Sequence, residues 1–273
     1  MPELPEVETI KEQLKKELLN RKITKVKVLY DGIIEYPTST LFEQQLVNQT
    51  IIDMDRKGKW IIFILNDYYL LSHLRMEGKY TFKPVGEGLN KHEHVIITLD
   101  NGLELRYKDT RKFGKMHLIK KEDLYNAKPM NELGLEPFSK ELTKEYLLDK
   151  FKSKSIAIKT SLLDQKIITG IGNIYADEIL FLSHINPLRK TNTITKEELQ
   201  LIINNSIEVL NESIKQGGTT VRTYTWKDGE KGHFQHNLYV YGRKDQPCLK
   251  CGTNIVKITV NGRGTHYCPV CQK

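Results

Sequence analysis

The chain has 273 residues, of which 39% are hydrophobic and 28% charged, values typical of a globular protein with room for two modest domains. No apolar run approaches the roughly 18 residues of a membrane span, and the acidic start MPELPEVE is unlike a secretory signal, so we expect a cytoplasmic protein without a membrane partner. The formal net charge is +8.

The first part of the chain is predicted to be β-rich behind one helix. Apolar residues recur at helical spacing through residues 6–19, which predicts an amphipathic helix. From residue 23 to about 119 the pattern changes to short β-rich runs, several of them separated by Gly, Asn or Asp. Such runs are typical of a sandwich or barrel. The segment 125–140, which contains two prolines and a glycine, is expected to be a hinge between domains.

Helices are predicted beyond this hinge. A short one is expected at 143–151, and residues 162–182 are expected to be helical around the interruption TGIGN. A longer helix begins at Thr195, because Thr195 and Glu198 have the spacing of a capping box. It is expected to end at Gly217, the first of two glycines that suit a helix C-cap.

The four cysteines lie near the C-terminus in the pattern C-x2-C, sixteen residues, C-x2-C. Two such pairs can complete a tetrahedral zinc site, and the alternative of two disulfides is disfavoured in an intracellular chain. We therefore predict one structural Zn²⁺. Its ligands are Cys248, Cys251, Cys268 and Cys271.

The positive charge is concentrated in the same region. Residues 215–273 carry ten Lys or Arg and three Asp or Glu, whereas the remainder of the chain is nearly neutral. A basic tail favours a polyanion partner, because neutralised phosphates release counterions. A solvated basic surface is the alternative that composition alone leaves open.

The N-terminus has unusual chemical possibilities. If Met1 is removed, Pro2 presents a secondary amine, and an α-amino group titrates near ~7.7–8.0. Such an amine can attack an aldehyde-like carbon and form an iminium, an electron sink for elimination reactions. Glu3 is adjacent and could donate and accept protons. A proline at position 2 is common, so this feature does not establish a function by itself.

Seven motifs, in order along the whole chain, resemble those of formamidopyrimidine-DNA glycosylase. They are MPELPEVET (1–9), RKGKW (56–60), KHEH (91–94), DTRKFG (109–114), TGIGNIYADE (169–178), QGGTT (216–220) and VYGRKDQPCLKCGT (240–253). The resemblance implies an enzyme that removes an oxidised purine and then cuts the strand. It also assigns roles to individual residues.

The catalytic residues implied by the resemblance come from two of these motifs, MPELPEVET and RKGKW, and from the turn NGRG. Pro2 matches the nucleophile that attacks the anomeric carbon, and Glu3 matches the acid and base. Glu6 matches a buried carboxylate that supports the amine, although a helix N-terminus would favour it as well. Lys59 matches a lysine that contacts phosphate and assists catalysis. Arg263, between the two cysteine pairs, matches an arginine that binds phosphate.

The DNA-binding residues implied by the resemblance serve two purposes. His92 matches a DNA-contacting position, and Asn173 in the TGIGN turn matches a phosphate clamp. Met76, Arg111 and Phe113 match the trio that fills the space left when the damaged nucleotide is flipped out of the helix. Ordinary core packing is the alternative for Met76 and Phe113.

The pattern departs from the family at one DNA contact. The usual phosphate-contacting position falls on Ser155, with Lys154 beside it, and both stay open as the contact. The loop from Thr219 to Phe234 matches the lesion-reading loop. Its variable residues, such as Val221 and Arg222, are not assigned.

We therefore predict an α+β protein with an N-terminal β-sandwich and flanking helices, a helical helix–two-turn–helix region and a C-terminal zinc ribbon. The expected domain boundaries are 1–130, 131–236 and 237–273. The predicted function is a monomeric, bifunctional DNA glycosylase and abasic-site lyase of base excision repair. Its substrates would be double-stranded DNA with 8-oxoguanine, formamidopyrimidines or abasic sites. The alternatives are an endonuclease VIII-like specificity for pyrimidines and a zinc-ribbon protein that binds DNA without chemistry.

Overall fold

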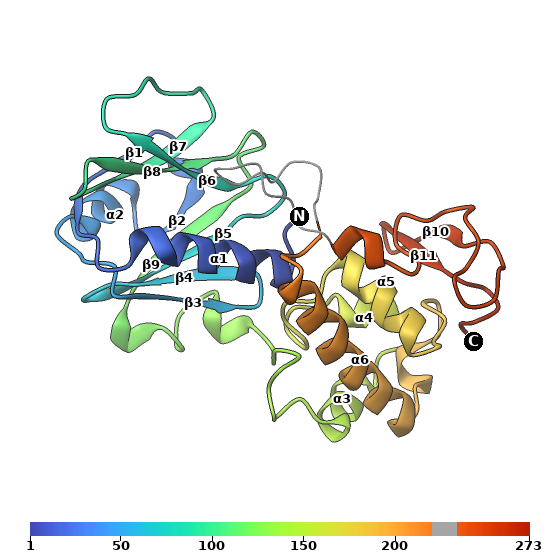
Figure 1. Ribbon diagram of the computed structural model, residues 1–273. Helices are drawn as coiled ribbons and strands as arrows, with labels where there is room; N and C mark the ends of the chain where they lie inside the picture. Colours follow the sequence, from blue (N-terminus) through green and yellow to red (C-terminus); the bar gives the residue numbers. More distant parts are fainter. Residues whose placement is uncertain (220–233) are drawn as a thin grey trace. The chain divides into compact units, whose positions relative to one another are not determined.

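The structure is a computed structural model that describes residues 1–219 and 234–273. It divides into two compact units, which are described separately (Figure 1). The first unit holds Met1–Pro2, Glu6–Asn131 and Thr219. The second holds Glu3–Pro5, Glu132–Gly218 and residues 234–273.

Two β-sheets form the first unit. In its described residues, a five-stranded sheet has the order β2-β9-β5-β4-β3 and a four-stranded sheet the order β1-β7-β8-β6. Neighbouring strands are antiparallel except β2 and β9, which are parallel. The strands are β1 (Ile23–Val28), β2 (Ile34–Tyr36), β3 (Asp53–Lys57), β4 (Trp60–Ile64), β5 (Tyr68–His73), β6 (Lys79–Pro84), β7 (Glu93–Leu99), β8 (Leu103–Lys108) and β9 (Lys115–Lys120).

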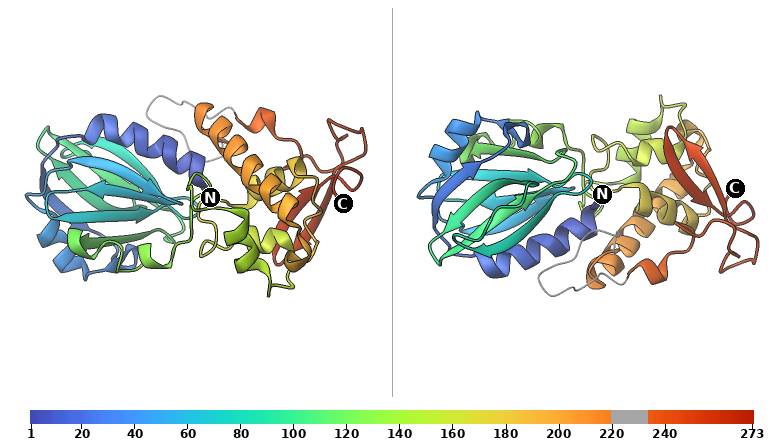
Figure 2. Two further views of the ribbon diagram at one scale, coloured as in Figure 1. Left: turned by 90° about the horizontal axis from the view of Figure 1, so that it is seen from below. Right: turned by 90° about the horizontal axis from the view of Figure 1, so that it is seen from above.

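One hydrophobic core lies between these sheets and confirms the predicted β-sandwich. Buried side chains from both sheets belong to it, including Phe63 of β4 and Ile97 of β7. Helix α1 (Leu4–Leu18) lies beside the sheets and adds the apolar face that its spacing predicted (Figures 1 and 2). Helix α2 (Ser39–Leu46) contributes Phe42 and Leu46 to the same core.

The second unit is mainly helical. It contains α3 (Lys144–Phe151), α4 (Ile158–Leu162), α5 (Asn173–Leu182), α6 (Lys196–Lys215) and a hairpin of β10 (Val256–Val260) and β11 (Arg263–Tyr267). Helices α5 and α6 pack together, and β11 packs against α5 (Figure 1). Short 3-10 helices complete the two units at Asp31–Ile33, Lys121–Asp123, Met130–Glu132, Thr191–Thr193 and Phe234–Asn237.

The capping box predicted for the long helix is confirmed. The Thr195 hydroxyl accepts a hydrogen bond from Glu198 N at 3.3 Å, and the Glu198 carboxylate accepts one from Thr195 N at 2.9 Å. The helix ends before Gly217, whose φ of 74° suits a residue without a side chain. None of the helices among the described residues is long and apolar enough to cross a membrane.

The predicted helix over 162–182 is interrupted for longer than expected. Helix α4 ends at Leu162, and α5 begins only at Asn173. The Gln165 carboxamide holds the intervening loop: its nitrogen donates to the carbonyls of Leu163 and Ile171, both at 2.9 Å, and its oxygen accepts from Gly170 N at 3.0 Å. Because this side chain bonds backbone groups that a helix would pair, the loop is stable without helical hydrogen bonds.

Candidate functional site

The Glu3 carboxylate lies at the N-terminus of α5. It is 3% exposed and accepts hydrogen bonds from the backbone N–H groups of Gly172, Ile174 and Tyr175, at 2.8, 2.9 and 3.3 Å. These are donors that a helix leaves unpaired in its first turn, where the helix dipole also stabilises negative charge. The arrangement requires glycine at 172, because a Cβ there would lie 2.3 Å from the Glu3 carboxyl carbon.

Glu6 is a buried carboxylate in the first unit. It is 8% exposed, and its Oε1 accepts hydrogen bonds from the backbone N–H and the hydroxyl of Thr219, at 2.8 and 3.0 Å. Thr219 begins the loop that the resemblance links to lesion reading. Residues 220–233 of that loop, which include Val221 and Arg222, lie outside the described residues.

Pro2 and Lys59 are also buried in the first unit. Lys59 is 5% exposed and follows Gly58, whose φ of 59° makes the tight turn between β3 and β4. Burial, together with the charges of Arg75 and Lys59, lowers the pKa of His73 to about 3. His73 is therefore neutral, and its Nδ1 accepts a hydrogen bond from Arg75 N at 3.0 Å.

Met76 lies in the turn between β5 and β6. Its side chain is 38% exposed, and the turn is closed by a hydrogen bond of 2.9 Å from Gly78 N to Leu74 O. Arg75 takes a positive φ of 52° in the same turn. Met76 is therefore a surface residue, and the core-packing alternative is wrong for it.

The turn that carries Arg111 and Phe113 is organised by one buried aspartate, which sequence reasoning missed. Asp109 is fully buried, and its carboxylate accepts hydrogen bonds from the backbone N–H groups of Arg111, Phe113 and Gly114, at 3.0, 2.9 and 2.8 Å. Phe113 is 49% exposed, so core packing is wrong for it too, and the Arg111 guanidinium lies 4.7 Å from the centre of its ring. The side chains of Arg111 and Phe113 therefore lie against each other at the surface.

A buried arginine stabilises the loop that carries His92. Arg106 is 1% exposed and donates to the Gly88 carbonyl and to the Glu93 carboxylate, both at 3.0 Å. Glu93 also accepts from Asn90 N at 2.9 Å, and the Asn90 side chain accepts from His92 N at 3.1 Å. This chain of bonds fixes the backbone of a half-exposed histidine.

A buried ion pair between α4 and α5 also binds the hairpin in the second unit. Lys159 and Asp177 lie 2.7 Å apart, and their side chains are 1% and 0% exposed. Lys159 also donates to Gly264 O at 3.0 Å and to the Thr265 hydroxyl at 2.8 Å, and Asp177 accepts from His266 N at 2.9 Å. Such a buried pair is costly to break from one side, since the remaining charge would be buried alone.

Asn173 lies on α5 and Arg263 on the hairpin. The Asn173 amide donates to Gly264 O at 2.9 Å, and Arg263 is exposed beside the hairpin turn. Asn261 and Gly262 form that turn, with φ values of 46° and 72° that are characteristic of a two-residue hairpin connection. The hairpin therefore holds the backbone of Arg263 beside the first residue of α5.

A second acidic residue of α5 fixes the chain that leads to the cysteines. Glu178 is 1% exposed and accepts hydrogen bonds from the N–H groups of Tyr239, Val240 and Tyr241, at 2.7 to 3.0 Å. Burial raises the pKa of Glu178 to about 7, although these three donors lower it. Sequence reasoning missed Glu178, Asp177 and Lys159, because nothing in their spacing distinguishes a buried ion pair from surface charges.

The four cysteine sulfurs lie within 4.8 Å of one another. The Sγ atoms of Cys248 and Cys271 are 3.9 Å apart, and those of Cys251 and Cys268 are 3.5 Å apart. These distances exclude disulfides, and they are close to the roughly 3.8 Å expected between thiolates on one tetrahedral Zn²⁺. The four cysteines thus form one structural zinc site, as predicted.

Lys154 lies elsewhere in the second unit. Its ammonium is 3.5 Å from the Asp164 carboxylate, and Ser155 beside it is exposed. Both side chains are partly or fully accessible, so the structure does not choose between them as a phosphate contact.

Three family models match most of the chain. The formamidopyrimidine-DNA glycosylase N-terminal domain matches residues 1–116, the formamidopyrimidine-DNA glycosylase H2TH domain matches 133–225, and a zinc finger found in FPG and IleRS matches 245–273. The chain belongs to the formamidopyrimidine-DNA glycosylase family. A formamidopyrimidine-DNA glycosylase of Oceanobacillus iheyensis is 47% identical over 273 residues, which are 100% of this chain and 98% of that protein.

Other family members show the same correspondence. A formamidopyrimidine-DNA glycosylase of Bacillus cereus is 44% identical over 100% of this chain and 99% of that protein. A crystal structure of a Lactococcus lactis Fpg variant with DNA that contains Fapy-dG has a TM-score of 0.93 and 37% identity, and both chains are fully covered. The Lactococcus lactis Fpg in complex with DNA that contains an abasic site has a TM-score of 0.92 and 36% identity, over 99% of each chain.

The Asp109 carboxylate is expected to stabilise the turn at 111–114. The variant Asp109→Ala leaves three backbone N–H groups without their acceptor, so the free energy of unfolding should fall by about 2 kcal/mol or more. Hydrogen exchange at the amides of Phe113 and Gly114 should become faster. Urea unfolding and exchange measurements test this, with the exposed Asp100→Ala as control. Equal stability of the two variants would contradict the assignment.

Metal removal is expected to affect the second unit selectively. The purified protein should contain one zinc per chain, and chelation should abolish amide protection in β10 and β11, because a segment this small depends on metal for its folding. Protection in β4 and β9 should persist, since the core of the sandwich includes none of the cysteines. Metal analysis and hydrogen exchange provide the readouts. Retained protection in the hairpin after complete chelation would show that the zinc is dispensable.

Proposed function

We propose that this chain is a bifunctional DNA glycosylase and abasic-site lyase that removes oxidised purines in base excision repair. One observation carries the proposal. Glu3, which directly follows Pro2 in the chain, has a buried carboxylate that accepts hydrogen bonds from the N–H groups at the N-terminus of α5. Family membership supports it, as do the named relatives and their complexes with Fapy-dG and abasic-site DNA.

The proposed reaction begins at the amine of Pro2 after Met1 has been removed. The nitrogen lone pair forms a bond to C1′ of the damaged nucleotide as the glycosidic bond breaks. The base leaves with the electron pair of the glycosidic bond and takes up a proton from water. Glu3 accepts the proton lost by the amine and returns one to the opening sugar ring. Three N–H donors fix its carboxylate, so little reorganisation is needed during proton transfer.

The resulting iminium then withdraws electrons from the sugar. Loss of a proton from C2′ breaks the bond between C3′ and its phosphate oxygen, and a second elimination releases the phosphate at C5′. Each step expels a phosphate whose negative charge a cation can stabilise. We assign this role to Lys59 and Arg263, with Glu6 supporting the amine. Zn²⁺, held by the four cysteines, supplies no chemistry of its own and keeps the hairpin of Arg263 folded.

The remaining predicted residues would recognise the DNA. Asn173 and His92 are proposed to bind phosphates of the double-stranded substrate, with Lys154 or Ser155 as a further contact. Met76, Arg111 and Phe113 are proposed to occupy the space vacated by the flipped nucleotide. Their exposure in two ordered turns supports this role, since side chains that enter a base stack have to be accessible.

The two alternative functions are less well supported. Specificity for oxidised pyrimidines would not require the trio of Met76, Arg111 and Phe113. A protein that binds DNA without chemistry would not require the buried carboxylates of Glu3 and Glu6. We further propose that the protein acts as a monomer.

Paired substitutions should separate chemistry from binding. Glu3→Gln is expected to reduce single-turnover excision of 8-oxoguanine at least about 100-fold, with DNA affinity nearly unchanged, because proton transfer acts in the transition state. Arg263→Ala is expected to weaken binding and to lower the salt slope by about 1, because one phosphate contact is lost. Glu12→Gln on α1 and Lys257→Ala on β10, both exposed, are the matched controls.

Activity and binding are measured together in this test. Excision assays and affinity titrations at several salt concentrations provide the comparison, and borohydride should trap wild-type protein covalently on abasic-site DNA. An active Glu3→Gln variant would exclude Glu3 as the acid and base. An absence of trapping by wild-type protein would support the binding-only alternative.

A further inference from the structure

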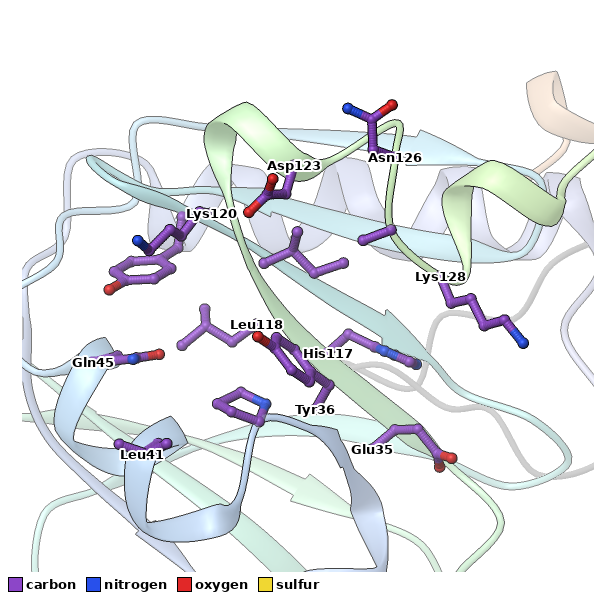
Figure 3. Close-up of a pocket in the computed structure, with 14 residues that line it drawn as sticks. Glu35, Tyr36, Leu41, Gln45, His117, Leu118, Lys120, Asp123, Asn126 and Lys128 are labelled. Atoms are coloured by element: carbon purple, nitrogen blue, oxygen red, sulfur yellow. The ribbon is translucent and has the colours of Figure 1, made fainter.

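A cavity in the first unit contains none of the residues assigned above. Its volume is about 590 Å³, within the range of pockets that bind small molecules. Helix α2, strands β2, β5 and β9 and the segment that follows β9 supply its walls (Figure 3). Because β2 is the edge strand of the five-stranded sheet, the cavity lies at that edge.

The walls offer flat apolar surfaces that the fold itself does not cover. Tyr36 is 59% exposed and Leu41 is 44% exposed, and both line the cavity with Pro37 and Tyr68. An aromatic ring and a proline ring are good stacking partners for a planar ligand. Large apolar side chains that lie exposed next to one another are characteristic of binding sites.

One buried polar side chain faces the cavity without a hydrogen-bond partner among the described residues. His117 is 8% exposed and lines the cavity, while its ring packs edge-on against Trp60 at 5.4 Å between centroids. Burial lowers the pKa of His117, although the charge of Glu35 raises it. The neutral imidazole has one donor and one acceptor nitrogen. It can therefore bond a ligand that offers the complementary pair.

The other polar groups of the cavity are suited to a neutral ligand. The carboxamide of Gln45 combines a donor and an acceptor, and it lines the cavity from helix α2 (Figure 3). This carboxamide has no hydrogen-bond partner within 1–219 or 234–273. The charges of the lining balance, with two cations and two anions. These are Lys120, Lys128, Glu35 and Asp123.

We propose that this cavity binds a neutral planar heteroaromatic molecule whose edge carries both hydrogen-bond donors and acceptors, the chemistry of a free purine base or nucleoside. The rings of Tyr36 and Tyr68 supply the stacking surfaces. The side chains of His117 and Gln45 supply the complementary polar edge. The site is separate from the proposed glycosylase chemistry and does not rest on it.

The test is a titration of the full-length, zinc-loaded protein with hypoxanthine and with inosine, followed by ¹H–¹⁵N NMR spectra. We expect saturable shifts at the amides of β9 and α2. Tyr36→Ala should weaken binding about tenfold or more, because a stacking surface is lost. His117→Phe should weaken binding also, since it keeps a ring against Trp60 but removes both nitrogens. Tyr125→Ala, a tyrosine that is 72% exposed and outside the cavity, should bind normally.

Two further measurements distinguish this cavity from other places where a purine could bind. The titration is repeated with a saturating duplex that contains an abasic-site analogue, and binding should persist. Inorganic phosphate, used alone as a probe, should cause no saturable shifts in β9. The proposal is overturned if purines do not bind, if Tyr36→Ala binds as tightly as wild type, or if the duplex displaces the purine. A stronger response to hypoxanthine than to inosine would identify the free base as the ligand, and the reverse would identify the nucleoside.

Discussion

The contact between the Glu3 carboxylate and the first turn of α5 links the stability of the structure to its proposed chemistry. A buried carboxylate is costly unless its oxygens are hydrogen-bonded, and the helix supplies three N–H donors that would otherwise lack partners. The same contact stabilises the helix terminus and fixes the residue next to Pro2. The stability of the protein and the proposed chemistry therefore both require this contact. The contact in turn requires glycine at position 172, because a side chain there would clash with Glu3.

Helix α5 organises the second unit in other ways as well. Asp177 pairs with Lys159 and binds the backbone of the hairpin, while Glu178 binds the chain before the cysteines. Three buried carboxylates, one at the N-terminus of α5 and two on the helix itself, thus accept hydrogen bonds from backbone N–H groups. In the first unit, Asp109 has a similar role in a turn. Both units use buried carboxylates to shape the backbone beside residues assigned to DNA.

Much of this architecture could be predicted from the sequence, and the missing part has a common physical cause. The capping box at Thr195, the sandwich and the zinc ligands follow from local spacing, since a helix cap, strand alternation and a paired cysteine motif involve near neighbours. The loop held by Gln165, and the partners of Asp177, depend on groups that the fold brings together. Spacing alone cannot distinguish such residues from polar residues at the surface.

In the proposed mechanism the α-amine of Pro2 is the nucleophile, with Glu3 beside it in the chain. Mass spectrometry of the borohydride-reduced complex with abasic-site DNA tests it most directly, after digestion of both protein and DNA. We expect an N-terminal peptide that lacks Met1 and carries the sugar remnant on the nitrogen of Pro2. A remnant on a lysine side chain, or fully active protein that retains Met1, would contradict it, because an acylated proline nitrogen has no basic lone pair.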